Sequence, residues 1–288
     1  MPYKIIFMGT PQFSVPVLES LVKSSYQISC VYTQSPKKSN RGQKLNPSPI
    51  QNCAENLKLA IRSPNNLNTE VELKFFKEVN PDIVVVVAYG QLISKKFLNI
   101  PKKGFINIHA SLLPKWRGAA PIQRAIINLD KETGVSIMKI KEELDSGPVM
   151  KKIKIDINPS DTSALISEKL SKISSEHIVG ALNDIFNKKD KFTEQDHDNS
   201  SYAKKIKKNE ARVNWTENAQ NIIGKINGLN PDPGAWFEYK NTRYKIWKAS
   251  ISDKTGAVGS ILDNNFIIGC KDKSIKITEI QREGKNKL

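Results

Sequence analysis

Short apolar runs alternate with amphipathic segments along the first two thirds of the chain. The short runs predict strands, and they cover Lys4–Met8, Ile28–Thr33, Ile83–Val87, Phe105–His109, Val135–Ile140 and Val149–Ile155. Apolar residues three or four apart predict helices, which cover Ser14–Lys23, Thr69–Val79, Ala119–Asn128 and a long segment from a cap at Ser160 and Asp161 to Ile185. Alternating strands and helices with right-handed crossovers predict an α/β domain over residues 1–187 with a Rossmann-like, mostly parallel sheet.

A polar stretch over residues 188–208 separates the alternating strands and helices from a C-terminal region of short apolar runs and turns. Its composition, rich in Lys, Asp and Ser, predicts a linker. Beyond it, short apolar runs alternate with turns at Trp236–Tyr239, Thr242–Trp247, Gly259–Leu262, Phe266–Ile268 and Ile275–Ile277. Several short strands with regular turn signals predict a small all-β C-terminal domain over residues 209–288, either a barrel or a sandwich.

Two polar side chains lie at the end of the predicted strand Phe105–His109. Residues two apart on a strand project to the same face, so Asn107 and His109 lie side by side where the strand ends. In open α/β sheets, ligands bind at the carboxyl ends of strands. Asp145 follows in a Ser-Gly-Pro turn that could bring a carboxylate to the same place. Each feature also has a structural interpretation, because Asn-x-His can be a hydrogen-bonded pair and tight turns select Asp and Gly.

The amino-acid sequence around these residues resembles that of a known protein family. Asn107 and His109 lead into Ser111-Leu112-Leu113-Pro114, and Leu144-Asp145-Ser146-Gly147 comes later, as in the formyltransferases that use 10-formyltetrahydrofolate. Four further segments are similar to the branch of that family that formylates methionyl-tRNA, namely Met8–Phe13, Arg41–Leu45, Pro47–Pro49 and Trp116–Gln123. The resemblance covers nearly the whole chain.

The resemblance implies that the protein transfers a formyl group from 10-formyltetrahydrofolate to the α-amine of initiator methionyl-tRNA, for translation initiation. It implies catalytic roles for Asn107, His109 and Asp145 and an oligonucleotide-binding-like (OB-like) barrel as the tRNA-binding C-terminal domain. It also implies that the loop after the catalytic strand contacts the folate, through Ser111, Leu112, Leu113 and Pro114. We expect Tyr89 and Gly90, just past the strand Ile83–Val87, to form a second wall for the pteridine.

In this reaction a neutral amine attacks a formamide carbonyl, which creates an oxyanion and a new ammonium group. The site must therefore stabilise the oxyanion and remove one proton from the ammonium. An α-amine titrates near pH 8, so a useful fraction is uncharged at neutral pH. Asn107 offers an amide N–H to the oxyanion, and His109 can donate or shuttle a proton. Asp145 either orients the imidazole or takes the amine proton itself, and the sequence leaves both roles open. No metal is needed.

A basic segment, Gln34–Pro49, is the candidate for tRNA contact. It contains Lys37, Lys38, Arg41 and Lys44 and no acidic residue, and it has no predicted secondary structure. Long loops of this kind are functional or disordered, and a basic loop suits an RNA backbone. The resemblance implies that Arg41 meets the tRNA acceptor end; the alternative is a disordered, lysine-rich insertion.

The net charge of +16 over 288 residues has two interpretations. It suits a polyanionic partner, but Lys is dense throughout the chain, so a compositional bias explains it as well. Aromatic residues in the C-terminal region could stack on bases or form that domain's core; they are Trp215, Trp236, Tyr244 and Trp247.

Other features exclude several classes of protein. Cys30, Cys53 and Cys270 are scattered without Cys-x-x-Cys or Cys/His spacing, so we expect neither disulfides nor a bound metal. The turn after the first strand, Gly9-Thr10-Pro11, lacks the glycine spacing of a dinucleotide site, so we expect no NAD or ATP. Without a signal peptide or a spanning apolar run, we expect a cytoplasmic protein that does not contact membranes. We also expect the protein to be a monomer.

Two alternatives stay open. One is a formyltransferase for another amine, such as glycinamide ribonucleotide or an amino sugar, or a formyl-folate hydrolase. The glycine-rich phosphate loop of the first and the appended dehydrogenase domain of the bifunctional sugar enzymes are both missing here. The other alternative is a non-catalytic RNA-binding protein, in which we would expect Asn107, His109 or Asp145 to be lost.

Overall fold

The computed structural model describes residues 2–39 and 44–288, with the backbone alone at residues 37–39 and 44. The chain divides into two compact units. The first unit contains Met1–Arg117, Gly134–Lys154 and Glu168–Ser201, and the second contains Gly118–Thr133, Ile155–Ser167 and Tyr202–Leu288. No helix within the described ranges is both long and apolar enough to cross a membrane.

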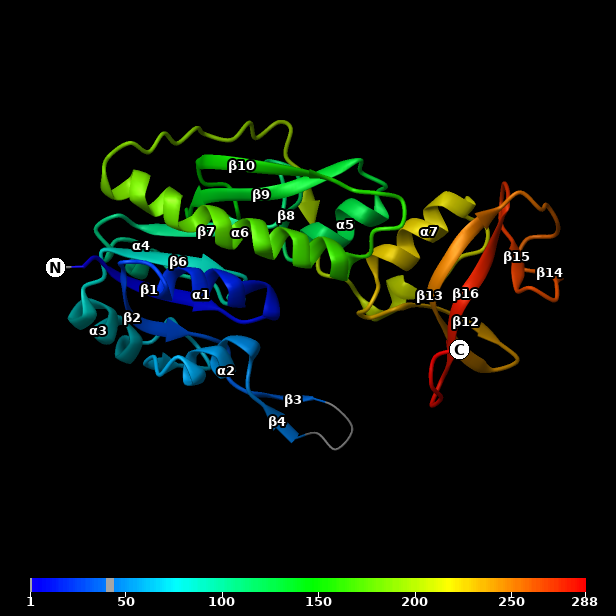
Figure 1. The fold of residues 1–288 in the computed structure, drawn as a ribbon, viewed down its shortest axis with the longest axis horizontal. Helices are drawn as coiled ribbons and strands as arrows, with labels where there is room; N and C mark the ends of the chain where they lie inside the picture. The colour runs from blue at the N-terminus through cyan, green and yellow to red at the C-terminus, as the bar shows by residue number, and fades with distance from the viewer. Residues whose placement is uncertain (1, 40–43) are drawn as a thin grey trace. The chain divides into compact units, whose positions relative to one another are not determined.

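A seven-stranded sheet forms the centre of the first unit (Figure 1). Its order is β10-β9-β7-β6-β1-β2-β5, with bounds β1 Lys4–Gly9, β2 Gln27–Tyr32, β5 Ile61–Arg62, β6 Ile83–Val87, β7 Phe105–His109, β9 Glu132–Lys139 and β10 Val149–Asp156. The β2–β5, β1–β2, β1–β6 and β6–β7 pairs are parallel, and β9 joins β7 antiparallel. The predicted Rossmann-like, mostly parallel sheet is therefore confirmed.

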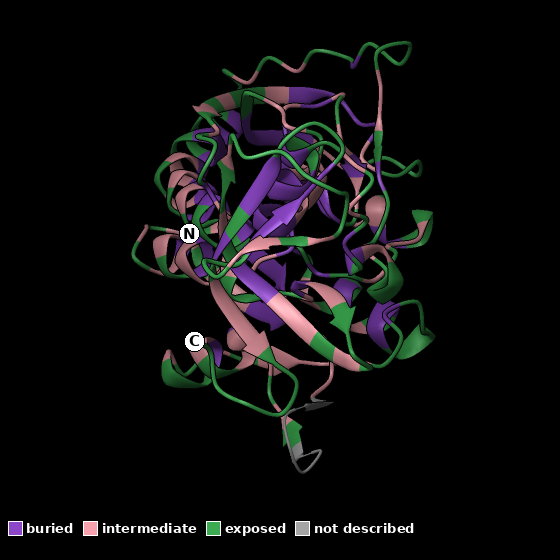
Figure 2. Cartoon of the chain, turned by 90° about the vertical axis from the view of Figure 1, so that its right-hand side faces the viewer, coloured by how far each residue is buried: buried purple, intermediate pink, exposed green. Residues whose placement is uncertain are grey.

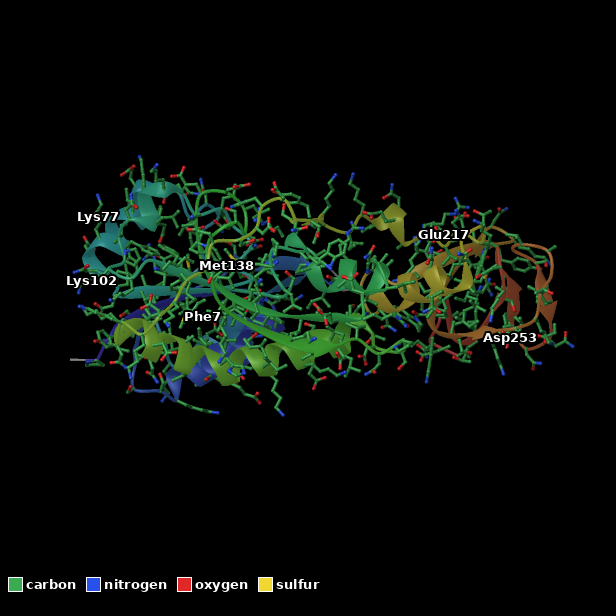
Figure 3. The ribbon with its side chains drawn as sticks, turned by 90° about the horizontal axis from the view of Figure 1, so that it is seen from above. Phe7, Lys77, Lys102, Met138, Glu217 and Asp253 are labelled. Carbon is green, nitrogen blue, oxygen red and sulfur yellow. The ribbon has the colours of Figure 1, made fainter. Side chains whose placement is uncertain are left out.

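Helices cover both faces of this sheet. Figure 1 shows α1 (Val15–Val22) and α6 (Ser163–Phe186) on one side. Figure 3, turned by 90°, shows α6 on the opposite side from Lys77 of α3 (Glu70–Val79). Because both faces are covered, β6 is buried at all five of its residues, as parallel strands with continuous apolar runs should be. Figure 2 shows such strands in purple.

Three helices start at residues other than those predicted. The segment expected from Ser14 begins as a 3₁₀ turn, Gln12–Ser14, before α1. The helix expected from Ala119 is α5 (Pro121–Ile127). The long helix starts at Ser163, because the Thr162 hydroxyl accepts from the Leu165 amide at 3.3 Å while Asp161 accepts from the Asn158 amide at 2.9 Å. Asp161 therefore closes the turn that precedes the helix.

A five-stranded antiparallel sheet lies at the centre of the second unit, in agreement with the predicted small β domain. Its order is β12-β13-β16-β15-β14, with bounds β12 Ala235–Tyr239, β13 Thr242–Ser252, β14 Ile261–Asp263, β15 Ile267–Gly269 and β16 Ser274–Arg282. Helix α7 (Ala219–Gly228) packs into the same core and is not among the predicted elements. Added Cβ atoms at Gly224 and Gly228 would lie only 2.6 Å from Leu129 Cδ2 and 2.7 Å from Ile127 Cγ1. These glycines obscure the helical pattern in the sequence but permit the close packing of α7.

Short elements complete the fold. They are α2 (Pro49–Asn56), α4 (Lys95–Leu98), the 3₁₀ turn Lys208–Ala211, the strand pair β3 (Lys37–Ser39) and β4 (Lys44–Asn46), and the strand pair β8 (Arg117–Gly118) and β11 (Tyr202–Ala203). The expectation that Gln34–Pro49 has no secondary structure is wrong, since β3 and β4 pair antiparallel within it. Within residues 188–208, Thr193 pairs with Val149 and the Gln195 side chain is buried.

Candidate active site

Strand β7 delivers Asn107 and His109 to the carboxyl end of the sheet. Asn107 pairs with Val86 of β6 on one side and with Met138 of β9, labelled in Figure 3, on the other. His109 is the last residue of the strand and is only 6% exposed. The backbone of both residues is held by flanking strands, so their side chains have a rigid base. The predicted side-by-side arrangement follows directly from the strand.

Asp145 comes from the loop that joins β9 to β10. Its φ is +49°, in the left-handed region that Asp tolerates better than most residues. Two residues on, an added Cβ at Gly147 would lie 1.9 Å from the Lys139 carbonyl oxygen, so only glycine fits there. The Lys139 amide also donates to Pro148 O at 3.0 Å, which closes the base of the loop.

The three side chains converge as the sequence predicts. Nδ2 of Asn107 donates to Oδ1 of Asp145 at 3.4 Å, and Nδ1 of His109 lies 3.6 Å from Oδ2 of the same carboxylate. Nε2 of His109 lies 2.8 Å from the carbonyl oxygen of Trp116. A carbonyl oxygen can only accept, so Nε2 carries a hydrogen. An amide donor, an imidazole and a carboxylate thus share one half-buried site.

The loop after β7 is held by its own hydrogen bonds. The Ser111 hydroxyl donates to Lys115 O at 2.6 Å, and the Ser136 hydroxyl donates to Ser111 O at 2.7 Å. Leu113 is fully buried, and its peptide bond to Pro114 is cis. Of the four residues expected to contact folate here, Leu112 and Pro114 are half-buried and the side chains of Ser111 and Leu113 face inward.

The Tyr89 ring lies in the core of the first unit and is 1% exposed. Burial raises the pKa of its hydroxyl, and the negative charge of Glu72 raises it further. Its backbone oxygen accepts from Thr10 Oγ1 at 2.9 Å and Gln34 Nε2 at 3.0 Å. Gly90, by contrast, is exposed, with φ +84°. A ligand at this segment would meet Gly90 and the backbone, not the tyrosine ring.

Comparison with known protein families agrees with the motifs. One family model, described as formyl transferase, matches residues 3–182, and a second, described as the formyl transferase C-terminal domain, matches residues 205–288. The chain belongs to the formyl transferase family. Two similar relatives are both named methionyl-tRNA formyltransferase. The protein from Pelagibacter ubique is 55% identical over 99% of this chain and 93% of its own length. That from Caulobacter vibrioides is 43% identical over 98% and 93%.

Several solved structures share the fold of this formyl transferase family member. The N-formyltransferase from Helicobacter canadensis, in complex with folinic acid and dTDP-3-aminofucose, has a TM-score of 0.72 at 18% identity, over 98% of this chain and 100% of that one. HypX from Aquifex aeolicus, in complex with tetrahydrofolic acid, has a TM-score of 0.69 at 18% identity, over 99% and 45%. At these identities the likeness concerns the fold alone.

Two groups at the site of this formyl transferase could not be predicted from the sequence. The Trp116 carbonyl acts through the backbone, and Gln195 lies in the polar stretch expected to be a linker. Gln195 is 7% exposed and contacts the Asp145 loop through its amide. Within the described ranges, no three His, Cys, Asp or Glu side chains gather in a way that could hold a metal ion.

Arg41 lies outside the described residues, as do the side chains of Lys37, Lys38 and Lys44. Basic residues also line two hollows in the second unit. One hollow is lined by Lys208, Asn209, Asp232, Pro233, Trp236, Arg243 and Lys245. The other is lined by Arg124, Tyr202, Lys204, Lys205, Lys207, Asn209 and Glu210.

The aromatic residues of the second unit serve mainly its core. Trp247 is buried and donates to Gln281 Oε1 at 3.0 Å. Trp215 packs edge-on against Phe237. The guanidinium of Arg243 lies 4.0 Å from the ring centroid of Trp236, so a cation already covers that ring.

Proposed function

We propose that the protein transfers the formyl group of 10-formyltetrahydrofolate to the α-amine of initiator methionyl-tRNA, acting as a monomer in the cytoplasm. The observation that carries the proposal is the convergence of Asn107, His109 and Asp145 at the carboxyl end of β7. These groups supply the three things the reaction needs: a donor for the oxyanion, a proton acceptor and a proton donor.

Asn107 is suited to stabilise the oxyanion. When the amine nitrogen attacks the formyl carbon, the carbonyl oxygen becomes negative, and the C–N10 bond of the folate breaks as it returns to neutral. The amide of Asn107 is fixed by its strand and by Asp145, so it needs no reorganisation during the reaction. A preorganised donor of this kind lowers the barrier by about 3–4 kcal/mol.

The net reaction moves one proton from the α-amine to the N10 atom that leaves. We infer that Asp145 takes the proton from the ammonium formed by attack, and that His109 supplies one to N10 from Nδ1. Transfer from the protonated Asp145 to Nδ1, 3.6 Å away, then restores both groups. Nε2 keeps its hydrogen throughout because it donates to Trp116 O.

The folate would meet the loops at the carboxyl ends of β6 and β7. Support comes from Gly90, which is exposed, and from Leu112 and Pro114, which are half-buried beside the catalytic strand. The tRNA would meet the basic segment that contains Arg41, together with the basic hollows of the second unit. These hollows carry more positive than negative side chains, as a phosphate-binding surface should.

One assay tests the proposed function. The protein is incubated with 10-formyltetrahydrofolate and either methionyl initiator tRNA, methionyl elongator tRNA or a dTDP-amino sugar, and N-formyl products are identified by mass spectrometry. We expect formyl-methionine from the initiator tRNA and little from the others. Formylation of the sugar alone would assign the other substrate class, and no product with any acceptor would contradict the proposal.

A further inference from the structure

Every hydrogen-bonding position of the Gln195 amide is used. Its Nε2 donates to the carbonyl oxygens of Asp145 at 2.8 Å and Gly147 at 2.7 Å. Its Oε1 accepts from Nε of Arg117 at 3.1 Å and from Nη2 at 2.9 Å. A buried amide that is saturated in this way cannot turn without leaving polar groups unpaired, which costs about 1–3 kcal/mol each. Gln195 therefore clamps the loop that carries Asp145.

Arg117 links this clamp to the other side of His109. It is 1% exposed and follows Trp116, whose carbonyl accepts from His109 Nε2. The Trp116 amide donates to Ser201 Oγ at 2.9 Å and the Arg117 amide donates to Ser201 O at 2.8 Å. Residues 195–201 thus bind both segments that touch the imidazole.

These contacts close a ring around His109. The path leads from Nε2 to Trp116 O, through the Arg117 side chain to Gln195, on to the Asp145 carbonyl, and from the Asp145 carboxylate back to Nδ1. We propose that Gln195 and Arg117 are positioning residues that set the separation of His109 and Asp145. This inference rests on the proposed function of the site. A displacement of about 1 Å in such a pair can cost about 10²-fold in rate.

Two substitutions isolate the clamp. Gln195→Glu still accepts from Arg117 but cannot donate, and it places a carboxylate against two carbonyl oxygens. Gln195→Met keeps the length of the side chain without the amide. Gln27→Glu makes the same charge change at an exposed position of the same unit and serves as the control.

The first readout is kinetic. We expect kcat for formyl transfer to fall about 10²-fold in both Gln195 variants, with little change in either KM and no change in Gln27→Glu. If Gln195 acts through Asp145, adding Gln195→Glu to Asp145→Asn should cause no further loss. If the loss of kcat in the double variant equals the product of the losses in the two single variants, Gln195 has a general structural role and the proposal is overturned.

The second readout does not depend on turnover. The chain has three histidines, so the ¹⁵N signals of His109 can be assigned as those missing from His109→Gln. We expect these signals to shift in Gln195→Glu and not in Gln27→Glu. If the wild-type protein transfers no formyl group, the proposed function fails while this measurement still tests the clamp. Wild-type turnover with unshifted signals, or failure of both Gln195 variants to fold, would overturn it.

Discussion

Nε2 of His109 lies 2.8 Å from the carbonyl oxygen of Trp116, and this contact determines which ring nitrogen can exchange a proton. Since the carbonyl only accepts, Nε2 is a donor in both the neutral and the charged ring. Exchange is left to Nδ1, which faces Asp145. In the Ser-His-Asp triad the carboxylate also faces Nδ1, but there Nε2 serves the nucleophile. The two arrangements therefore share residue types and differ in the path of the proton.

Asp145→Asn should abolish most formyl transfer without unfolding the protein. The amide has the volume of the carboxyl group but cannot take a proton, so we expect a loss of about 10²–10⁴ in single-turnover rate. Asp184→Asn, at an exposed position of α6, makes the same change away from the site and should be neutral. If Asp145→Asn retains activity while Asp145→Ala unfolds, the carboxylate is structural.

Asn107→Ala should lower kcat by about 10²–10³ with little change in either KM, because the oxyanion that the amide stabilises forms only after substrates have bound. Asn107→Asp should be worse, since it brings a second carboxylate beside Asp145, whose Oδ1 now accepts from the Asn107 amide at 3.4 Å. Steady-state kinetics with both substrates varied separates these effects. Equal losses in kcat and in substrate binding would argue against an oxyanion role.

The sequence predicts the parts of the site that depend on local periodicity. Asn107 and His109 are two apart on a strand, so their common face follows from the pattern alone. The contacts of Trp116 O and Gln195 could not be predicted, because one uses a backbone atom and the other joins residues distant in the chain. Helix α7 was hidden for a different reason: Gly224 and Gly228 lower helix propensity but are required by close packing.

Glu72 should make the first unit sensitive to acid. Its carboxylate accepts from Arg62 Nε and Nη2 at 2.7 Å and from the Tyr32 hydroxyl at 2.7 Å. Burial alone raises the pKa of Glu72, but these hydrogen bonds outweigh burial, and the pKa lies below its ordinary value. Such a group stabilises the fold above its unfolded pKa of about 4.3, and the contribution is lost as the pH falls through the folded value.

Glu72→Gln should therefore cost about 3 kcal/mol in the free energy of unfolding at pH 7, because it leaves Arg62 without its charged partner. The gap to the wild type should narrow as the pH falls below the unfolded pKa of about 4.3 toward the lowered pKa of Glu72 in the folded protein. Urea titrations across this range measure both effects. Glu78→Gln, at an exposed position of the same helix, should change the free energy by less than about 0.5 kcal/mol. A gap that stays constant with pH would refute the linkage.

The last prediction concerns tRNA binding by the second unit. Lys204, Lys205 and Lys207 are exposed beside one of the basic hollows, where Arg124 is already paired with Glu210 at 2.8 Å. If these lysines meet phosphates, replacing all three with Ala should weaken tRNA binding. It should also make log affinity fall less steeply with log salt, by about 0.7–0.9 in the magnitude of the slope for each phosphate that is no longer neutralised. Binding of the folate, assigned to the first unit, should not change.

Lys74→Ala combined with Lys77→Ala, on exposed positions of α3, removes positive charge from the other unit and should leave the slope unaltered. If both sets of substitutions lower tRNA affinity by the same factor per charge, net charge and not a defined surface governs binding.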